Sequence, residues 1–229
     1  MKSDAWTTAQ IWESGWWGDC TNTFWEETKQ MTYARLMGLE PEFDNETGRL
    51  PTYDLHQATV LDIGAGPVSL LLKCKNGKMC GYDPCYYPAW VYHRYGAAHI
   101  TFFKKKAEDI PDNWIVDEVW IYNVLTHVEN PKIIIDKALR ISKIVRLFEW
   151  LNTPVCNGHL QTLNQKQMDE WLNGTGRVQP LNENGCTGLS YSGIFLGAHY
   201  GKVQVSPTNT SSSTSIKGVF ELRVYAEEP

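Results

Sequence analysis

The sequence predicts a single α/β domain built on a mostly parallel sheet with helices on both faces, and three observations carry that prediction. Short β-branched apolar runs alternate with segments of helical period between residues 58 and 172. An acid and two glycines end the first of those runs, at 62–66. The chain has 229 residues, 42% of them hydrophobic and 21% charged, which suits one well-buried core.

The order of the elements follows from the periodicity along the chain. The predicted strands are 58–63, 78–82, 99–103, 118–122, 143–150, 193–200 and 218–225. The predicted helices are 23–39, 69–73, 89–95, 131–141 and 165–172. Strands that alternate with helices imply right-handed crossovers and parallel pairing. The last two strands, separated by a serine- and threonine-rich tract at 206–215, predict an antiparallel C-terminal hairpin at the edge of a seven-stranded sheet.

The region before the sheet is rich in tryptophan. We expect residues 1–55 to form a helical cap and residues 56–229 to form the domain that carries the sheet. Tryptophans crowd the first 25 residues, at Trp6, Trp12, Trp16, Trp17 and Trp25. They form either a lid that excludes water from a pocket or a surface that packs the first helix onto the sheet. Glu26 and Glu27 belong to that lid or to a solvated helix face, and the solvated face is favoured.

Composition restricts the classes of partner. A net charge of -5 disfavours binding to a nucleic-acid backbone. No basic segment leads into an apolar run near the N-terminus, so we expect neither export nor a membrane span, and a cytoplasmic protein. The six cysteines are interpreted as reduced thiols, and because no CxxC pair occurs among them we predict no metal site.

The turn after the first predicted strand indicates a cofactor site. Glycines at 64 and 66 let the backbone approach a ligand that a Cβ would strike. Dinucleotides and S-adenosylmethionine both bind at such turns. The acid Asp62 would repel a pyrophosphate but suits the cationic sulfonium and ammonium groups of S-adenosylmethionine. Asp83, about twenty residues on, ends the next strand, where ribose hydroxyls are bound in both classes.

In these segments the chain resembles the class I, Rossmann-like S-adenosylmethionine-dependent methyltransferases. The resemblance covers 59–154, through motifs at 60–66, 81–83, 106–110 and 119–128. It implies that the turn glycines face the amino-acid end of the cofactor, Asp83 the ribose, Glu108 or Asp109 the adenine, and Asn123 the methionine part. The candidate cofactor-binding residues are Asp62, Gly64, Ala65, Gly66, Asp83, Pro84, Glu108, Asp109, Asn123 and Val124. The chain departs from the family pattern at Val68, where a third glycine is common.

The sequence indicates the residues that would contact the methyl acceptor less clearly than those of the cofactor site. His127 follows the fourth strand of that pattern and is a candidate base, although packing or capping of the next helix is favoured. Glu149 is a second candidate catalytic residue, as a side chain at the rim or as a partner of a helix cap. The candidate pocket residues are Trp16, Trp17, Trp150 and His159. Segments typical of DNA methyltransferases, an Asp- or Asn-Pro-Pro-aromatic run or a Pro-Cys pair, do not occur.

The sequence therefore predicts a methyltransferase that uses S-adenosylmethionine and acts by direct displacement on a small-molecule acceptor. Two alternatives stay open, a non-catalytic S-adenosylmethionine-binding module and, with less support, a nicotinamide-dependent oxidoreductase. The acceptor atom and the oligomeric state are not determined by the sequence.

Overall fold

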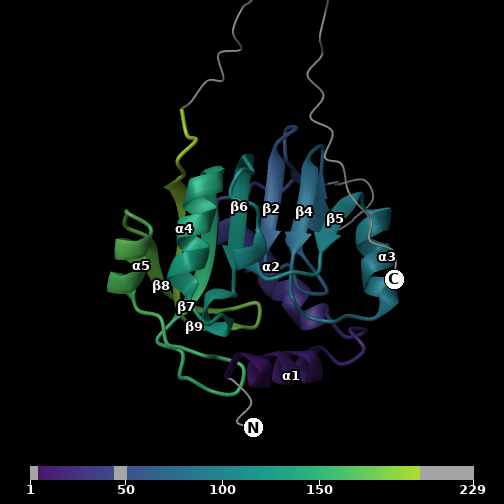
Figure 1. The fold of residues 1–229 in the computed structure, drawn as a ribbon, viewed down its shortest axis with the longest axis horizontal. Helices are drawn as coiled ribbons and strands as arrows, with labels where there is room; N and C mark the ends of the chain where they lie inside the picture. The colour runs from purple at the N-terminus through teal and green to yellow at the C-terminus, as the bar shows by residue number, and fades with distance from the viewer. Residues whose placement is uncertain (1–4, 44–50, 202–229) are drawn as a thin grey trace, which may run out of the picture.

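A twisted seven-stranded sheet forms the centre of the protein (Figure 1). The structure is a computed structural model that describes residues 5–43 and 51–201. The strands are β1 Tyr53–Asp54, β2 Thr59–Ile63, β3 Cys74–Lys75, β4 Lys78–Tyr82, β5 Ile100–Phe103, β6 Val116–Tyr122, β7 Ser142–Leu151, β8 Arg177–Glu183 and β9 Cys186–Leu196. The large sheet has the order β5-β4-β2-β6-β7-β9-β8, and β1 pairs with β3 separately.

Five α-helices and three 3-10 turns connect these strands in the described ranges. They are α1 Ala5–Trp17, α2 Phe24–Leu36, η1 Leu70–Lys73, α3 Ala89–Ala97, η2 Ala107–Asp109, η3 Leu125–His127, α4 Pro131–Ile141 and α5 Gln165–Trp171. Strands β5, β4, β2, β6 and β7 are parallel, whereas β9 runs antiparallel to both β7 and β8. The predicted fold class is therefore confirmed.

Alternate residues of each strand face two different cores, as the pleat requires. Leu61 of β2 packs in a cluster with α4 and α5. Its neighbour Val60 packs in a second cluster with α2, α3 and η1 on the other face of the sheet. Near-continuous apolar strands are the expected result of burial on both faces.

The segment after the glycine turn differs from the prediction. We expected a helix at 69–73, but the chain forms only the 3-10 turn η1 and then the short strand β3. Ser69 caps η1 by accepting a hydrogen bond from the Leu71 amide. A longer helix has no room, because β3 pairs with β1 and β4 begins at Lys78. Val68, where a third glycine would pack helix against strand, thus lies where no α-helix forms.

The C-terminal hairpin exists, but not at the predicted residues. It is formed by β8 and β9, and only the first part of 193–200 belongs to it. The predicted strand 218–225 and the tract 206–215 lie outside the described residues. β8 is an edge strand with little burial and a proline, so it lacks an apolar alternation. Asn184 and Gly185, both with positive φ, form the two-residue turn, and this Asn-Gly pair is a strong hairpin signal.

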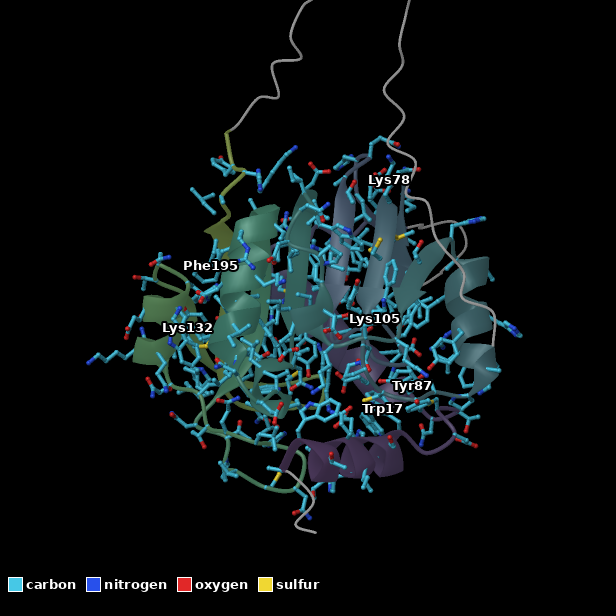
Figure 2. The ribbon with its side chains drawn as sticks, viewed as in Figure 1. Trp17, Lys78, Tyr87, Lys105, Lys132 and Phe195 are labelled. Carbon is cyan, nitrogen blue, oxygen red and sulfur yellow. The ribbon has the colours of Figure 1, made fainter. Side chains whose placement is uncertain are left out.

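Helix α1 lies across the end of the sheet toward which the arrows of β2, β4 and β6 point (Figure 1). Figure 2 places Trp17 and Tyr87 at this end and Lys78, which begins β4, at the opposite end. The division into a cap at 1–55 and a domain at 56–229 stays a prediction. No helix within the described ranges has the length and apolar character needed to cross a membrane.

Candidate active site at the carboxyl edge of the sheet

A cavity of about 360 Å³ lies between the carboxyl ends of the parallel strands and helix α1. The structure brings most of the predicted site residues to it. These are Trp16, Trp17, Gly64, Ala65, Gly66, Asp83, Pro84, Asn123, Val124, His127, Trp150 and His159. Four predicted site residues do not line this cavity, namely Asp62, Glu108, Asp109 and Glu149.

The glycine turn after β2 forms part of the cavity wall on the side of the sheet. Gly64 has a φ of 75°, and a Cβ added there would lie 2.3 Å from Cγ2 of Val124. Gly66 has a φ of 61° and faces Trp17, whose ring lies 3.9 Å from the position of an added Cβ. Both glycines are therefore required by conformation, and the first is also required by the packing of the turn that follows β6.

Asp83, directly after β4, is fixed by its neighbours. Its Oδ2 accepts a hydrogen bond from the Gly66 amide at 3.0 Å. Its Oδ1 accepts hydrogen bonds from the Cys85 amide and from the Tyr87 hydroxyl, both at 2.9 Å. Burial raises the pKa of this carboxyl above its usual value, whereas these hydrogen bonds lower it. The carboxylate thus links the ends of β2 and β4 at the cavity edge.

Asp62 belongs to β2 and is fully buried behind the residues that line the cavity. Its Oδ2 accepts hydrogen bonds from the Ser69 and Tyr122 hydroxyls, and Oδ1 has no hydrogen-bond partner. Complete burial raises the pKa of Asp62 to about 7. The side chain therefore joins β2, η1 and β6, and a direct contact between Asp62 and a ligand stays a prediction.

Glu149 holds the turn that follows β6. Its Oε1 accepts hydrogen bonds from the amides of Val124 and Leu125, both at 2.7 Å, and Oε2 has no hydrogen-bond partner. Burial raises the pKa of Glu149 to about 7. These bonds fix Val124 against Gly64, while Asn123, at a φ of 56°, turns the chain out of the strand. Glu149 is thus placed to position the cavity wall.

The two acids near the predicted adenine site lie apart from the cavity lining. Glu108 and Asp109 belong to η2, after β5. Glu108 is half-buried and Asp109 is exposed. Their predicted contact with an adenine amino group stays a prediction.

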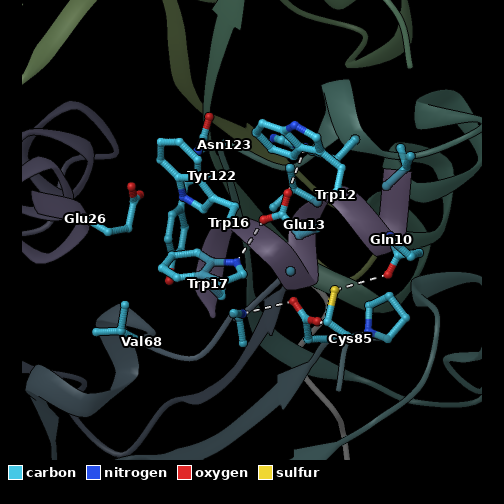
Figure 3. Close-up of a pocket in the computed structure, with 18 of the residues that line it drawn as sticks. Gln10, Trp12, Glu13, Trp16, Trp17, Glu26, Val68, Cys85, Tyr122 and Asn123 are labelled. Atoms are coloured by element: carbon cyan, nitrogen blue, oxygen red, sulfur yellow. Dashed lines mark hydrogen bonds and ion pairs between the residues drawn. The ribbon is translucent and has the colours of Figure 1, made fainter. Parts of the chain in front are cut away.

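Helix α1 supplies the wall that faces the strand ends, and with it a residue that the sequence analysis missed. Glu13 lines the cavity, and its Oε1 accepts a hydrogen bond of 2.9 Å from Nε1 of Trp17 (Figure 3). Trp12 and Trp16 stack with ring centroids 5.6 Å apart. Glu13 and Trp17 are four residues apart, as are Trp12 and Trp16, and this spacing puts each pair on one side of a helix. The spacing was the available signal for Glu13.

His127 and His159 meet at one end of the cavity, with ring centroids 4.8 Å apart. Nδ1 of His127 lies 3.6 Å from Oε2 of Glu13. Burial, together with the neighbouring His159, lowers the pKa of His127 to about 4. The imidazole is therefore neutral at physiological pH, and the 3.6 Å contact is not an ion pair.

Helix α2 also reaches the cavity, which corrects a second expectation. Glu26, assigned above to a solvated helix face, lines the cavity with its side chain only 16% exposed. It forms an ion pair with Lys29 at 3.2 Å. Glu27, which is half-buried, accepts a hydrogen bond from the Thr23 hydroxyl. The helical period correctly located α2, but it did not show which face the cavity uses.

Comparison with known proteins gives similarity of structure rather than of sequence. No family model matches the chain, and no curated protein sequence matches it. Magnesium protoporphyrin IX methyltransferase from Synechocystis PCC 6803, solved with bound S-adenosylmethionine, superposes with a TM-score of 0.57 at 14% identity, over 86% of this chain and 98% of that chain.

Two further solved structures match over most of their length. The N-methyltransferase NodS from Bradyrhizobium japonicum WM9, in complex with S-adenosylhomocysteine, has a TM-score of 0.55 at 12% identity, over 86% of this chain and 100% of that chain. The 1,6-didemethyltoxoflavin-N1-methyltransferase from Burkholderia thailandensis, with 1,6-didemethyltoxoflavin and S-adenosylhomocysteine bound, has a TM-score of 0.55 at 15% identity, over 84% of this chain and 88% of that chain. The protein therefore has the fold of the class I S-adenosylmethionine-dependent methyltransferases.

Proposed function

We propose that this protein binds S-adenosylmethionine in the cavity between α1 and the strand ends and transfers its methyl group to a small-molecule acceptor. The observation that carries the proposal is the convergence of the glycine turn, Asp83 and the turn after β6 on one cavity at the carboxyl edge of the sheet. In doubly wound α/β folds this edge is where ligands bind. The cavity volume of about 360 Å³ lies within the range of small-molecule sites.

The residues present fit this cofactor. Gly64 and Gly66 leave the backbone bare, and Ala65 adds only a methyl group. Asn123, in the neighbouring strand-end turn, lines the same cavity, so these residues would hold the methionine part. Asp83 would accept a hydrogen bond from a ribose hydroxyl at Oδ2, since Oδ2 accepts one hydrogen bond here whereas Oδ1 already accepts two. When bound, the cofactor supplies a methyl group on a sulfonium. The chain's own task is to align an acceptor with that methyl group and to exclude water.

The local structure disfavours the nicotinamide alternative. A pyrophosphate is bound at the N-terminus of an α-helix, where amide dipoles attract an anion. In the described structure the glycine turn leads into the four-residue 3-10 turn η1 instead. Asp62 and Asp83, both buried here, would also repel an anion. The same features suit a cation.

A small acceptor is favoured by the aromatic cover of the cavity. Trp12, Trp16 and Trp17 of α1 line it from above, and Trp150 of β7 lines it from the sheet. Such walls offer flat apolar surfaces, as in most small-molecule sites.

Isothermal titration with S-adenosylhomocysteine tests the proposal. We expect binding to the wild-type protein, and Asp83→Ala should weaken it roughly tenfold or more, because a hydrogen bond to a charged group contributes about 1.5–3 kcal/mol. Asp136→Ala is the matched control, since Asp136 is a surface carboxylate that pairs with Lys132 on α4. Absence of binding, or thermal stabilisation by NAD instead, would contradict the proposal.

A further inference from the structure

Oε2 of Glu13 and Nδ1 of His127 face each other inside the cavity. Oε1 of Glu13 is used by the Trp17 indole, so Oε2 is the oxygen that points to His127. The imidazole makes its hydrogen bond with the backbone of Gly158, and its buried Nδ1 has no hydrogen-bond partner. We assign the imidazole proton to Nε2, which leaves a lone pair on Nδ1, so the 3.6 Å between Oε2 and Nδ1 separates two lone pairs. One proton placed on Glu13 would convert this repulsion into a hydrogen bond.

The surroundings make Glu13 the group that takes such a proton. Burial, followed by the nearby Asp83 and Glu26, raises the pKa of Glu13 to about 7, whereas the hydrogen bond from Trp17 opposes this rise. His127 stays neutral, because its pKa is about 4. Near neutral pH, Glu13 thus changes its protonation state easily and His127 does not, which suits Glu13 to the role of a general base.

The walls around Glu13 favour a cation. Trp12, Trp16 and Trp17 line the same cavity, and the negative face of an indole attracts a positive charge. Trp6, which also lines the cavity, already makes a cation–π contact, because Nζ of Lys106 lies 3.5 Å from its ring centroid. An anionic acceptor would instead meet the carboxylates of Glu13, Glu26 and Asp83.

Building on the proposed function, we propose that the acceptor is an amine that enters as an ammonium ion, and that Glu13 binds it and removes its proton. The N–H bond breaks and the proton moves to Oε2 of Glu13, where His127 Nδ1 accepts a hydrogen bond from it. The freed nitrogen lone pair forms the new N–C bond to the methyl group. The C–S bond breaks at the same time, and its electron pair stays on sulfur. The product leaves as a methylated ammonium ion, and Glu13 returns its proton to water.

Several titratable groups face Glu13, and each bears on its protonation. Asp83, Glu26 and Cys85 interact with it electrostatically. His127 and His159 lie at the same end of the cavity, and Lys29 neutralises Glu26 in part. The remaining negative charge favours protonation of Glu13 and also attracts an ammonium ion.

Three probes of one shape test the proposal without knowledge of the natural acceptor. Benzylammonium, benzyl alcohol and benzoate are titrated into the protein saturated with S-adenosylhomocysteine, and binding is followed by tryptophan fluorescence. Benzylammonium should bind roughly tenfold more tightly than the other two, because only it pairs with a carboxylate. Its affinity should rise with pH through the Glu13 pKa of about 7, since an alkylammonium stays charged there, as lysine does.

Glu13→Gln should abolish this preference and its pH dependence. The amide keeps an oxygen for the Trp17 indole, so α1 should stay in place, and Glu40→Gln, at an exposed position outside the cavity, is the matched control. Equal affinity for the three probes in the wild type, or unchanged selectivity in Glu13→Gln, would overturn the proposal. Weaker S-adenosylhomocysteine binding in Glu13→Gln would also overturn it, because Glu13 would then serve the cofactor. Absence of S-adenosylhomocysteine binding in the wild type contradicts the proposed function instead.

Discussion

The two sides of the cavity are built in different ways. Its floor, which we define as the strand-end turns 64–66, 83–85 and 123–125, is held by hydrogen bonds that Asp83 and Glu149 accept from backbone amides. Its roof, helix α1, buries only Ala9 fully, and Trp16 on it is 65% exposed. The floor is thus shaped by the sheet before any ligand arrives, whereas few buried contacts hold the roof.

This difference matches the division of labour in the proposed enzyme. A cofactor that is the same in every turnover is best served by a preorganised floor. An acceptor that enters and leaves is best served by a roof with few buried contacts, which can adjust at little cost. The two proposals therefore assign the cofactor to the floor and the acceptor to Glu13 and the tryptophans of the roof.

The largest contrast between floor and roof should come from paired glycine substitutions. Gly64→Ala should lower the free energy of unfolding by about 3 kcal/mol, from left-handed backbone strain and a clash with Val124. Gly15→Ala in α1 meets no atom within 4 Å, and it should stabilise the protein by about 0.5–1 kcal/mol, as alanine does in a helix. Urea denaturation measures both, and equal effects would contradict the contrast.

A somewhat smaller effect is expected at the turn after β6. Glu149→Ala should lower the free energy of unfolding by about 2 kcal/mol, because the buried amides of Val124 and Leu125 lose their acceptor. Glu149→Gln keeps an oxygen there and should cost less than half as much. On the roof, Trp16→Ala should change stability by less than about 1 kcal/mol, because the ring is mostly exposed. Thermal and urea unfolding of the three variants measure these changes. The comparison of floor and roof would be wrong if Trp16→Ala lowered stability more than Glu149→Ala.

The smallest effect, taken per pH unit, concerns the buried carboxyl of Asp62, which lies in β2 behind the floor. The folded-state pKa of Asp62 is raised from 3.8 to about 7, so its stabilising contribution is complete below 3.8 and is lost as pH rises through 7. In that window unfolding releases a proton, and each such group lowers the free energy of unfolding by about 1.4 kcal/mol per pH unit. Glu149 acts in the same direction. Asp62→Asn should therefore flatten the decline without removing it, and an unchanged slope between pH 4 and 8 would refute this account of Asp62.

The part of the fold that depends on local pattern was predictable from the sequence. Strand β4 and helix α4 have the predicted bounds, because apolar periodicity and the proline at the start of α4 mark them clearly. The 3-10 turn η1 was not predicted, because the pairing of β1 with β3 overrides the helical tendency of its leucines. Two-residue strands are too short to show a periodic pattern in the sequence.

The sequence by itself determined an α/β chain with a bare glycine turn between two acids, since strand period, turn chemistry and residue order are local properties. Only the tertiary structure decided that Asp83 lines the cavity while Asp62 does not. It also decided that Glu13 and His127, which are 114 residues apart in the sequence, lie next to each other. The physical reason is that burial and proximity depend on how α1 and the strand ends meet in space. No property of a single segment contains that information.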